Sequence, residues 1–223
     1  MRRPGESTVT APRRPLATRQ AGWAIALARW LARAGVRPNG ISISGVAIAF
    51  ATGVALAISA ERTPHVRALL LLAAAVGVQL RLLCNLLDGM LAVEGGLKSK
   101  TGDIFNEMPD RIADVFILVG AGYSIRHLPH GVTLGWAAAL VAVFTAYVRQ
   151  MGGALGVTQH FIGPMAKQHR MFTLTVACVI AAIEAMLTLA PRAMFAGLTL
   201  IIVGSVVTAV RRTRRIVSEM EAR

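Results

Sequence analysis

The sequence is short of acidic residues, cysteines and aromatic side chains. Its 223 residues include 11 Asp and Glu and two cysteines, and aromatic residues make up only 5%. Cys84 and Cys178 are too few and too far apart to form a disulfide scaffold. Charged residues make up 16% of the chain, whereas ordinary soluble domains have roughly 25%. Hydrophobic residues reach 55%, which excludes intrinsic disorder for most of the chain and points away from a soluble domain.

The sequence contains long runs of apolar residues, and its mean hydropathy is +0.58. A helix that spans a bilayer needs roughly 20 mostly apolar residues. Six stretches have about that length, namely 38–60, 68–93, 103–125, 127–148, 171–190 and 193–210. We therefore expect an all-α integral membrane protein whose six transmembrane helices form one domain over residues 38–210.

The basic residues predict the orientation of these helices. Lys and Arg number 24, and the net charge is +13. They gather in the leading segment, in the second and fourth connections and in the tail at 211–223, whereas the other connections hold Arg62, Arg67, Arg126 and Arg192. Because cytoplasmic loops carry the excess of Lys and Arg, both termini are expected in the cytoplasm. No zinc-finger spacing or RNA-binding motif favours nucleic acid as a partner.

The N-terminal residues divide into two parts. Residues 1–17 contain prolines and few apolar positions, which is typical of a mobile basic tail, although a mitochondrial transit peptide is also rich in Arg and poor in acids. The whole chain shares this usage of Ala and Arg, so we favour a bacterial inner (cytoplasmic) membrane. Within 18–37, Trp23, Leu27 and Trp30 fall at helical spacing, which predicts an amphipathic helix in the headgroup layer. This helix is a simple anchor or shapes a groove for lipid access.

Most of the acids crowd around the connection between the second and third spans. Asn85 and Asp88 are three residues apart at the end of the second span. Asn106 and Asp110 are four apart at the start of the third, so each pair falls on one helix face. The Gly-rich connection is short enough to place the two helix ends side by side. Four oxygen-bearing side chains would then converge, which suits a hard divalent cation such as Mg²⁺ that bridges substrate phosphates.

These residues resemble the signature of the CDP-alcohol phosphatidyltransferase family, D-x2-D-G-x2-A-R-x8-G-x3-D-x3-D. The positions that match in register are Asp88, Gly89, Ala92, Gly102 and Asp110. The run PNGIS at 38–42 also resembles the segment that opens a helix in this family. The resemblance implies a membrane transferase that moves a phosphatidyl or similar group from a CDP-linked lipid to a small alcohol and releases CMP, with its active site on the cytoplasmic side.

The resemblance also implies roles for individual residues. It assigns the metal, one or two ions of Mg²⁺ or Mn²⁺, to Asn85, Asp88, Asn106 and Asp110, with Asp110 also the catalytic base. It assigns CDP binding to Asn39, Asp88, Gly89, Ala92 and Gly102, and Lys98 and Lys100 are candidates to replace the signature Arg, which is Val93 here. Because Asn85 and Asn106 stand where the signature has Asp, each keeps a carbonyl oxygen but removes a negative charge. The metal affinity should therefore fall.

Other acids on the third span could supply the lost charge. Glu107 and Asp114 are the candidates, on a stripe that also includes Asp103 and Asp110. A simpler explanation of Asp103 and Glu107 is that acids favour the N-terminus of a helix. An acid within a span is a functional candidate, but Asp114 could instead form a buried pair with an arginine such as Arg81 or Arg111.

Arg81 shares the helix face of Asn85 and Asp88 but lies about two turns deeper than Asp88. It either holds a lipid phosphate or neutralises Asp114 or Glu184, and we favour the pairing role. On the same membrane side, the resemblance implies a basic pocket for the acceptor, with Arg149, Lys167 and Arg170 as the candidates. Positive-inside anchoring accounts for part of this charge.

The sequence is also compatible with two further classes of function. A non-catalytic relative that binds CDP-lipid or another anionic lipid, as a sensor or partner subunit, would explain the loss of two carboxylates and one Arg. A small transporter would explain the charged residues within spans, although no internal repeat supports it. The acceptor alcohol is not determined by the sequence, and a homodimer is compatible with it.

Overall fold

The computed structural model describes residues 21–94, 102–159 and 162–223. In this part of the chain every regular element is a helix, as predicted. The elements are α1 (Gly22–Arg33), α2 (Pro38–Ser59), α3 (Pro64–Glu94), α4 (Gly102–Tyr123), α5 (Gly131–Ala154), α6 (Lys167–Met186) and α7 (Arg192–Glu221).

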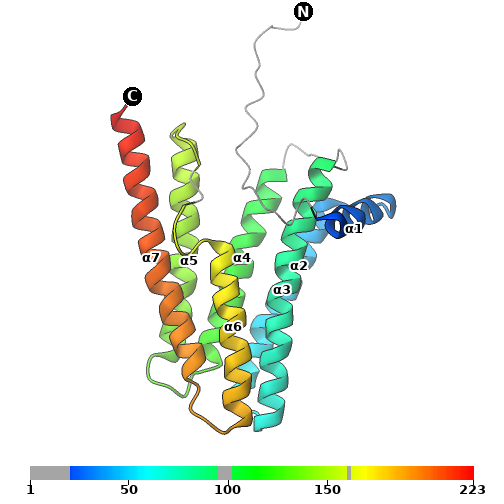
Figure 1. The fold of residues 1–223 in the computed structure, drawn as a ribbon, viewed down its shortest axis with the longest axis vertical. Coiled ribbons are helices and arrows are strands. Elements are labelled where there is room, and N and C mark those ends of the chain that lie inside the picture. Colours follow the sequence, from blue (N-terminus) through cyan, green and yellow to red (C-terminus); the bar gives the residue numbers. More distant parts are fainter. Residues whose placement is uncertain (1–20, 95–101, 160–161) are drawn as a thin grey trace, which may run out of the picture.

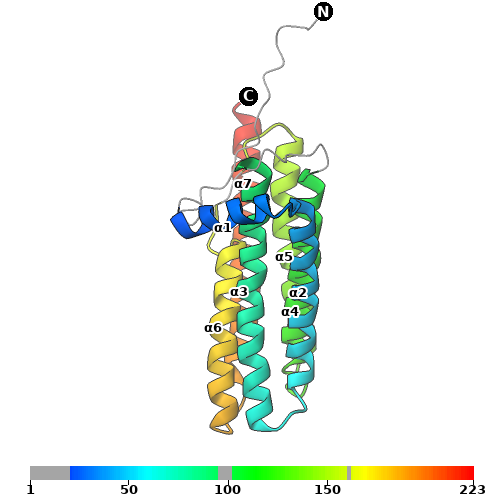
Figure 2. The ribbon, with the colours of Figure 1, turned by 90° about the vertical axis from the view of Figure 1, so that its right-hand side faces the viewer.

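Helices α2 to α7 form an elongated bundle, and α1 lies across it near one end (Figures 1 and 2). In the bundle α2 packs against α3 and α4, α3 against α6, α4 against α5, and α5 against α7. The C-terminal end of α7 points to the same end of the bundle as α1 (Figure 1). The placement of this end in the cytoplasm remains a prediction.

Five of the described helices, α2, α3, α5, α6 and α7, are long and apolar enough to cross a membrane. They correspond to five of the six predicted spans. The sixth corresponds to α4, whose first half carries Asp103, Glu107, Asp110 and Arg111. The assignment of α4 as a span therefore remains a prediction, although α4 packs inside the bundle between α2 and α5.

Glycines allow α4 to approach both of its neighbours closely. A Cβ atom on Gly120 would lie 2.4 Å from the carbonyl oxygen of Gly53 on α2, and one on Gly122 would lie 2.6 Å from the Cα of Gly135 on α5. Small residues at helix contacts let backbones meet in this way in membrane proteins. As a result, the C-terminal half of α4 is held tightly between α2 and α5.

Helix α1 packs on the end of α3 that carries the candidate ligands. Its buried residues Ala24 and Ala28 contact a cluster that includes Leu87 and Met90, on either side of Asp88. The indole of Trp30 on the outer face is 63% exposed. One apolar face on the bundle and one aromatic outer face fit the predicted headgroup-layer helix, a placement that remains a proposal.

Candidate functional site

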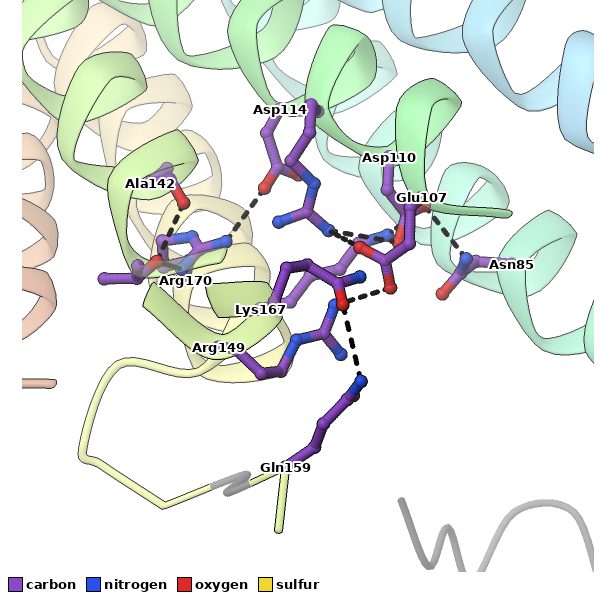
Figure 3. Close-up of polar contacts among 12 residues, drawn as sticks. Asn85, Glu107, Asp110, Asp114, Ala142, Arg149, Gln159, Lys167 and Arg170 are labelled. Atoms are coloured by element: carbon purple, nitrogen blue, oxygen red, sulfur yellow. Dashed lines mark hydrogen bonds and ion pairs between the residues drawn. The ribbon is translucent and has the colours of Figure 1, made fainter. Parts of the chain in front are cut away.

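Charged side chains from four helices meet inside one end of the bundle (Figure 3). Asn85 and Asp88 lie near the end of α3, Asp110 lies in α4, Arg149 lies in α5, and Lys167 begins α6. Asn85, Asp110 and Lys167 point toward one another in Figure 3. The bundle thus brings together Asn85 and Asp110, two of the predicted α3 and α4 residues, with Lys167, which the sequence placed in a separate basic pocket.

Asp110 is the centre of this cluster. Its Oδ1 atom accepts a hydrogen bond of 2.9 Å from the amide nitrogen of Asn85 and a second one from Arg81, and it lies 2.5 Å from Lys167 Nζ. The other oxygen, Oδ2, lies 3.6 Å from Arg111 Nη2. The Asp110 side chain is 10% exposed and that of Arg81 is 2% exposed. A buried carboxylate is therefore held by several cations, with Oδ2 in the looser contact.

Asp88 is buried on the neighbouring turn of α3. Its Oδ2 atom accepts a bond of 2.7 Å from the hydroxyl of Ser42 on α2. Its Oδ1 atom has no hydrogen-bond partner among the residues that the structure describes. Buried polar atoms are normally paired, so an unpaired carboxylate oxygen marks a place for a ligand or a cation. Ser42 belongs to the PNGIS segment at 38–42, but no separate role was predicted for it from the sequence.

Glu107 joins the cluster from one turn nearer the start of α4. Its Oε1 atom lies 2.5 Å from Arg149 Nη2 at the end of α5, and its Oε2 atom lies 3.6 Å from Arg111 Nη2. These contacts place Glu107 and Arg149 beside Asp110 (Figure 3). The role of Glu107 as a compensating acid remains a prediction.

A second buried ion pair lies deeper in the bundle. Asp114 Oδ2 accepts a hydrogen bond of 2.8 Å from Arg170 Nη2, and these side chains are 2% and 3% exposed. Arg170 Nη1 donates to Thr145 Oγ1 and to the carbonyl oxygen of Met165, both at 3.2 Å. This network joins α4, α5 and α6.

The prediction that Arg81 forms an ion pair with an acid is confirmed, but the predicted acid was wrong. Arg81 pairs with Asp110, whereas the sequence suggested Asp114 or Glu184. The reason is that α6 supplies Arg170 to Asp114 from its first turn. Glu184 lies near the opposite end of the bundle, where its carboxylate accepts hydrogen bonds of 3.0 and 3.2 Å from the backbone N–H of Ala193.

Several predicted residues are not tested by these contacts. Lys98 and Lys100 lie outside the described residues, and so does the side chain of Asn106, although its backbone is part of α4. Asn39 lies in the first turn of α2, Gly89 and Ala92 are half-buried near the end of α3, and Gly102 begins α4. Their roles in CDP binding remain predictions.

Residues of α7 that the sequence did not single out fix the start of α6. Arg212 donates from Nε to the carbonyl oxygen of Ile162 at 3.0 Å and from Nη1 to that of Thr145 at 2.8 Å. Thr208 Oγ1 accepts a bond of 3.0 Å from the N–H of Met165. In the sequence Arg212 is one of several arginines in a basic tail. Only its spacing of four residues from Thr208, which puts both on one helix face, distinguishes it.

The described residues offer few oxygen atoms to a divalent ion. Among the described residues, no group of three or more His, Cys, Asp or Glu side chains converges as a metal site. Asp88 offers its unpaired Oδ1 atom, Asp110 lies across from it, and Asn85 adds an amide oxygen. Carboxylate and amide oxygens suit Mg²⁺ or Mn²⁺. At the four signature positions only Asp88 and Asp110 are carboxylates, because Asn stands at the other two.

Comparison with known proteins shows the fold. No family model and no curated protein matches the sequence. The bundle has the fold of a membrane enzyme of phospholipid synthesis, phosphatidylinositol phosphate synthase (PgsA1) of Mycobacterium tuberculosis, which is a member of the CDP-alcohol phosphatidyltransferase family. Its complex with manganese and citrate is 22% identical, with a TM-score of 0.72 over 86% of this chain and 88% of that chain.

Two further structures of the same enzyme agree. The form with CDP-DAG bound is 23% identical, with a TM-score of 0.72 over 88% of this chain and 94% of that chain. The apo form is 23% identical, with a TM-score of 0.69 over 85% of this chain and 93% of that chain. At such identity the likeness establishes the architecture, and the chemistry must be argued from the residues of this chain.

Proposed function

We propose that this protein transfers a phosphatidyl or similar substituted phosphate group from a CDP-linked lipid, such as CDP-diacylglycerol, to a small alcohol and releases CMP. The observation that carries the proposal is the buried cluster of Asp88 and Asp110 with basic side chains, at one end of an otherwise apolar bundle. A group transfer between a lipid and a water-soluble alcohol needs such a place near the headgroup layer. A protein of the same fold has been solved with CDP-DAG bound, which supports the choice of donor.

The reaction is a displacement at phosphorus. The hydroxyl oxygen of the acceptor attacks the phosphorus atom that carries the lipid, and the bond from that phosphorus to the oxygen of CMP breaks, so that CMP leaves with the electron pair. The hydroxyl proton passes to Asp110, which acts as general base. Oδ2 is the better acceptor atom for this proton, because its contact with Arg111 at 3.6 Å is looser than the contacts of Oδ1.

The residues that would hold a divalent ion are Asp88, Asp110 and Asn85, with Asn106 as a further ligand predicted by the sequence. When bound, Mg²⁺ or Mn²⁺ supplies positive charge that offsets the charge developing on the leaving CMP. A structure of the same fold contains manganese, which is consistent with this choice of ion. Ser42 orients Asp88 through its hydrogen bond to Oδ2 and leaves Oδ1 available.

The acceptor enters from the side of α5 and α6. Arg149 contacts Glu107 there, next to the pair of Lys167 and Asp110, and the charge of Arg149 attracts the phosphate of a phosphorylated alcohol. Arg170 forms an ion pair with Asp114, so it stabilises the helices around this pocket and does not bind the acceptor itself. We further propose that the site faces the cytoplasm of a bacterial inner membrane, with α1 in the headgroup layer.

A direct assay tests the transfer reaction. The purified full-length chain in lipid nanodiscs is mixed with CDP-diacylglycerol, Mg²⁺ or Mn²⁺ and a panel of acceptors that includes glycerol phosphate, inositol phosphate and serine. We expect CMP release with one acceptor, together with an equal amount of a new phospholipid detected by mass spectrometry. Glu61→Gln is the matched control, because Glu61 pairs with Arg126 at the opposite end of the bundle. Absence of CMP with every acceptor would contradict the proposal.

A second candidate, a protein that binds CDP-lipid without turning it over, is favoured by one observation. Asn85 replaces a signature carboxylate and donates its amide N–H to Asp110, which occupies the proposed base. For this candidate we expect CDP-diacylglycerol to bind to the wild type without CMP release. The double substitution Asn85→Asp/Asn106→Asp would then restore turnover, measured in the same assay. If the wild type already turns over, this candidate fails.

A further inference from the structure

The charge balance of the site differs from that of a centre built for two metal ions. Among the residues that the structure describes, the carboxylates of the cluster are those of Asp88, Glu107 and Asp110. The cations that contact Glu107 and Asp110 are Arg81, Arg111, Arg149 and Lys167, so these described side chains carry one net positive charge before any metal binds. Adding two divalent ions to a positive, largely buried cluster is strongly unfavourable, because charges repel most where water is excluded.

Lys167 and Arg81 both contact Oδ1 of Asp110, an oxygen atom that a metal ion would otherwise use. Lys167 Nζ lies 2.5 Å from Asp110 Oδ1, and Arg81 donates to the same oxygen. Lys167 is 14% exposed and Arg81 is 2% exposed, so neither side chain is a mobile surface group. An ammonium and a guanidinium supply positive charge and N–H donors at the position where a metal ion would supply charge and coordination.

These cations also carry donors that lack acceptors. The buried nitrogen atoms without a hydrogen-bond partner among the described residues include Arg81 Nε, Arg81 Nη1 and Arg111 Nε, whereas Lys167 Nζ forms an ion pair with Asp110. In the described part of the cluster, Asp88 Oδ1 is the unpaired acceptor. Unsatisfied buried donors indicate a missing partner rich in oxygen. A pyrophosphate, with several anionic oxygens, matches this excess of donors over acceptors.

We infer that Lys167 and Arg81 take the place of one of the two divalent ions, and that they bind the pyrophosphate of the CDP-linked lipid directly. At most one ion then binds, beside Asp88. This inference rests on the proposed CDP-lipid substrate but not on turnover. It accounts for Asn85 and Asn106 together, because a site that loses one ion no longer needs four carboxylates, and fewer carboxylates leave room for a buried ammonium group.

The first test counts ions and removes them. Full-length protein in nanodiscs is saturated with CDP-diacylglycerol, and bound Mn²⁺ is measured by electron paramagnetic resonance. We expect at most one Mn²⁺ per chain, and two in the variant Asn85→Asp/Asn106→Asp/Lys167→Met. In EDTA the wild type should bind CDP-diacylglycerol with a Kd less than tenfold above that in Mg²⁺. Two Mn²⁺ per wild-type chain, or a Kd raised tenfold or more by EDTA, overturns the inference.

The second test isolates the ammonium. Lys167→Met should raise the Kd for CDP-diacylglycerol in EDTA at least tenfold, whereas Lys167→Arg, which keeps the charge, should retain binding. Arg214→Met is the control, because Arg214 is an exposed residue of the basic tail. Equal binding by wild type and Lys167→Met in EDTA overturns the inference. If Lys167→Met does not fold, the Mn²⁺ count and the EDTA comparison on the wild type decide by themselves.

The outcomes separate this inference from the proposed function. Wild type that binds CDP-diacylglycerol in EDTA but releases no CMP with any acceptor would remove the transfer reaction and leave the inference standing. If the wild type releases CMP but binds two Mn²⁺ ions, the transfer reaction stands and the inference fails. If the wild type bound inorganic pyrophosphate but not CDP-diacylglycerol, Lys167 and Arg81 would still form an anion site, but the CDP-lipid would not be its ligand. That result would contradict the inference.

Discussion

Asp110→Asn is expected to lower CMP release by about 100-fold to 10,000-fold, the range that a positioned general base contributes. Asparagine keeps the shape and the oxygen that faces Arg81 and Lys167, but it cannot take the proton of the acceptor hydroxyl. In EDTA, where Asp110 has no role as a metal ligand, the same change only removes a negative charge from a pocket proposed to hold a pyrophosphate, so CDP-diacylglycerol should bind no more weakly than to the wild type. The measurement is kcat from CMP release, with the Kd for CDP-diacylglycerol measured separately.

Glu107→Gln provides the matched comparison for this variant. Glu107 lies on the same helix and also contacts an arginine of the cluster, at 2.5 Å from Arg149. If the role of Asp110 is proton transfer, the loss of kcat should be confined to Asp110→Asn, with at most a few-fold effect for Glu107→Gln. Equal loss in both variants would show a general electrostatic role instead. Thermal unfolding of both proteins checks that Arg81 and Lys167 remain accommodated without the Asp110 charge.

Arg170→Met is expected to lower the free energy of unfolding by about 3–5 kcal/mol, the usual cost of leaving one member of a buried ion pair alone. Asp114 and Arg170 are 2% and 3% exposed, and without Arg170 the carboxylate of Asp114 would remain in the bundle without its cation. The hydrogen bonds from Arg170 to Thr145 and to Met165 would also be lost. Equilibrium unfolding in mixed micelles measures the change.

Two further variants distinguish a buried pair from an ordinary loss of charge. Arg170→Met/Asp114→Asn should be more stable than Arg170→Met alone, because no unpaired charge then remains. Arg215→Met removes an arginine from an exposed pair, in which Arg215 Nε lies 3.0 Å from Glu219 Oε1, and it should cost less than about 1 kcal/mol. A similar cost for Arg170→Met and Arg215→Met would show that Asp114 does not depend on its partner.

Much of the architecture could be read from the chain. Runs of apolar residues predicted the helices, because in lipid the backbone must satisfy its own hydrogen bonds and a helix does so within one segment. The boundaries were less predictable. Helix α6 begins at Lys167 rather than near residue 171, and α7 continues to Glu221 rather than ending near residue 210. Hydropathy identifies the apolar segments that lipid can surround. It does not identify the polar helix ends, which contacts within the protein stabilise.

The α3 and α4 part of the site was also predictable, since residues three or four apart share a helix face. Asn85 and Asp110 do meet, with a hydrogen bond of 2.9 Å between them. The contribution of α6 was not predictable in the same way. Lys167 stood out only as one member of a basic cluster, and the sequence does not show that its ammonium group lies 2.5 Å from Asp110.

The sequence by itself therefore determined the helical membrane fold, the charged end of the bundle and the two surviving carboxylates, Asp88 and Asp110. The tertiary structure decided which cation faces which acid. Arg81 forms an ion pair with Asp110, and Arg170 forms one with Asp114. The relative rotation and depth of α3, α4 and α6 determine these pairs. Periodicity gives the face of one helix, but the depth at which helices far apart in the chain meet depends on the packing of the whole bundle, down to the contact of Gly53 with Gly120.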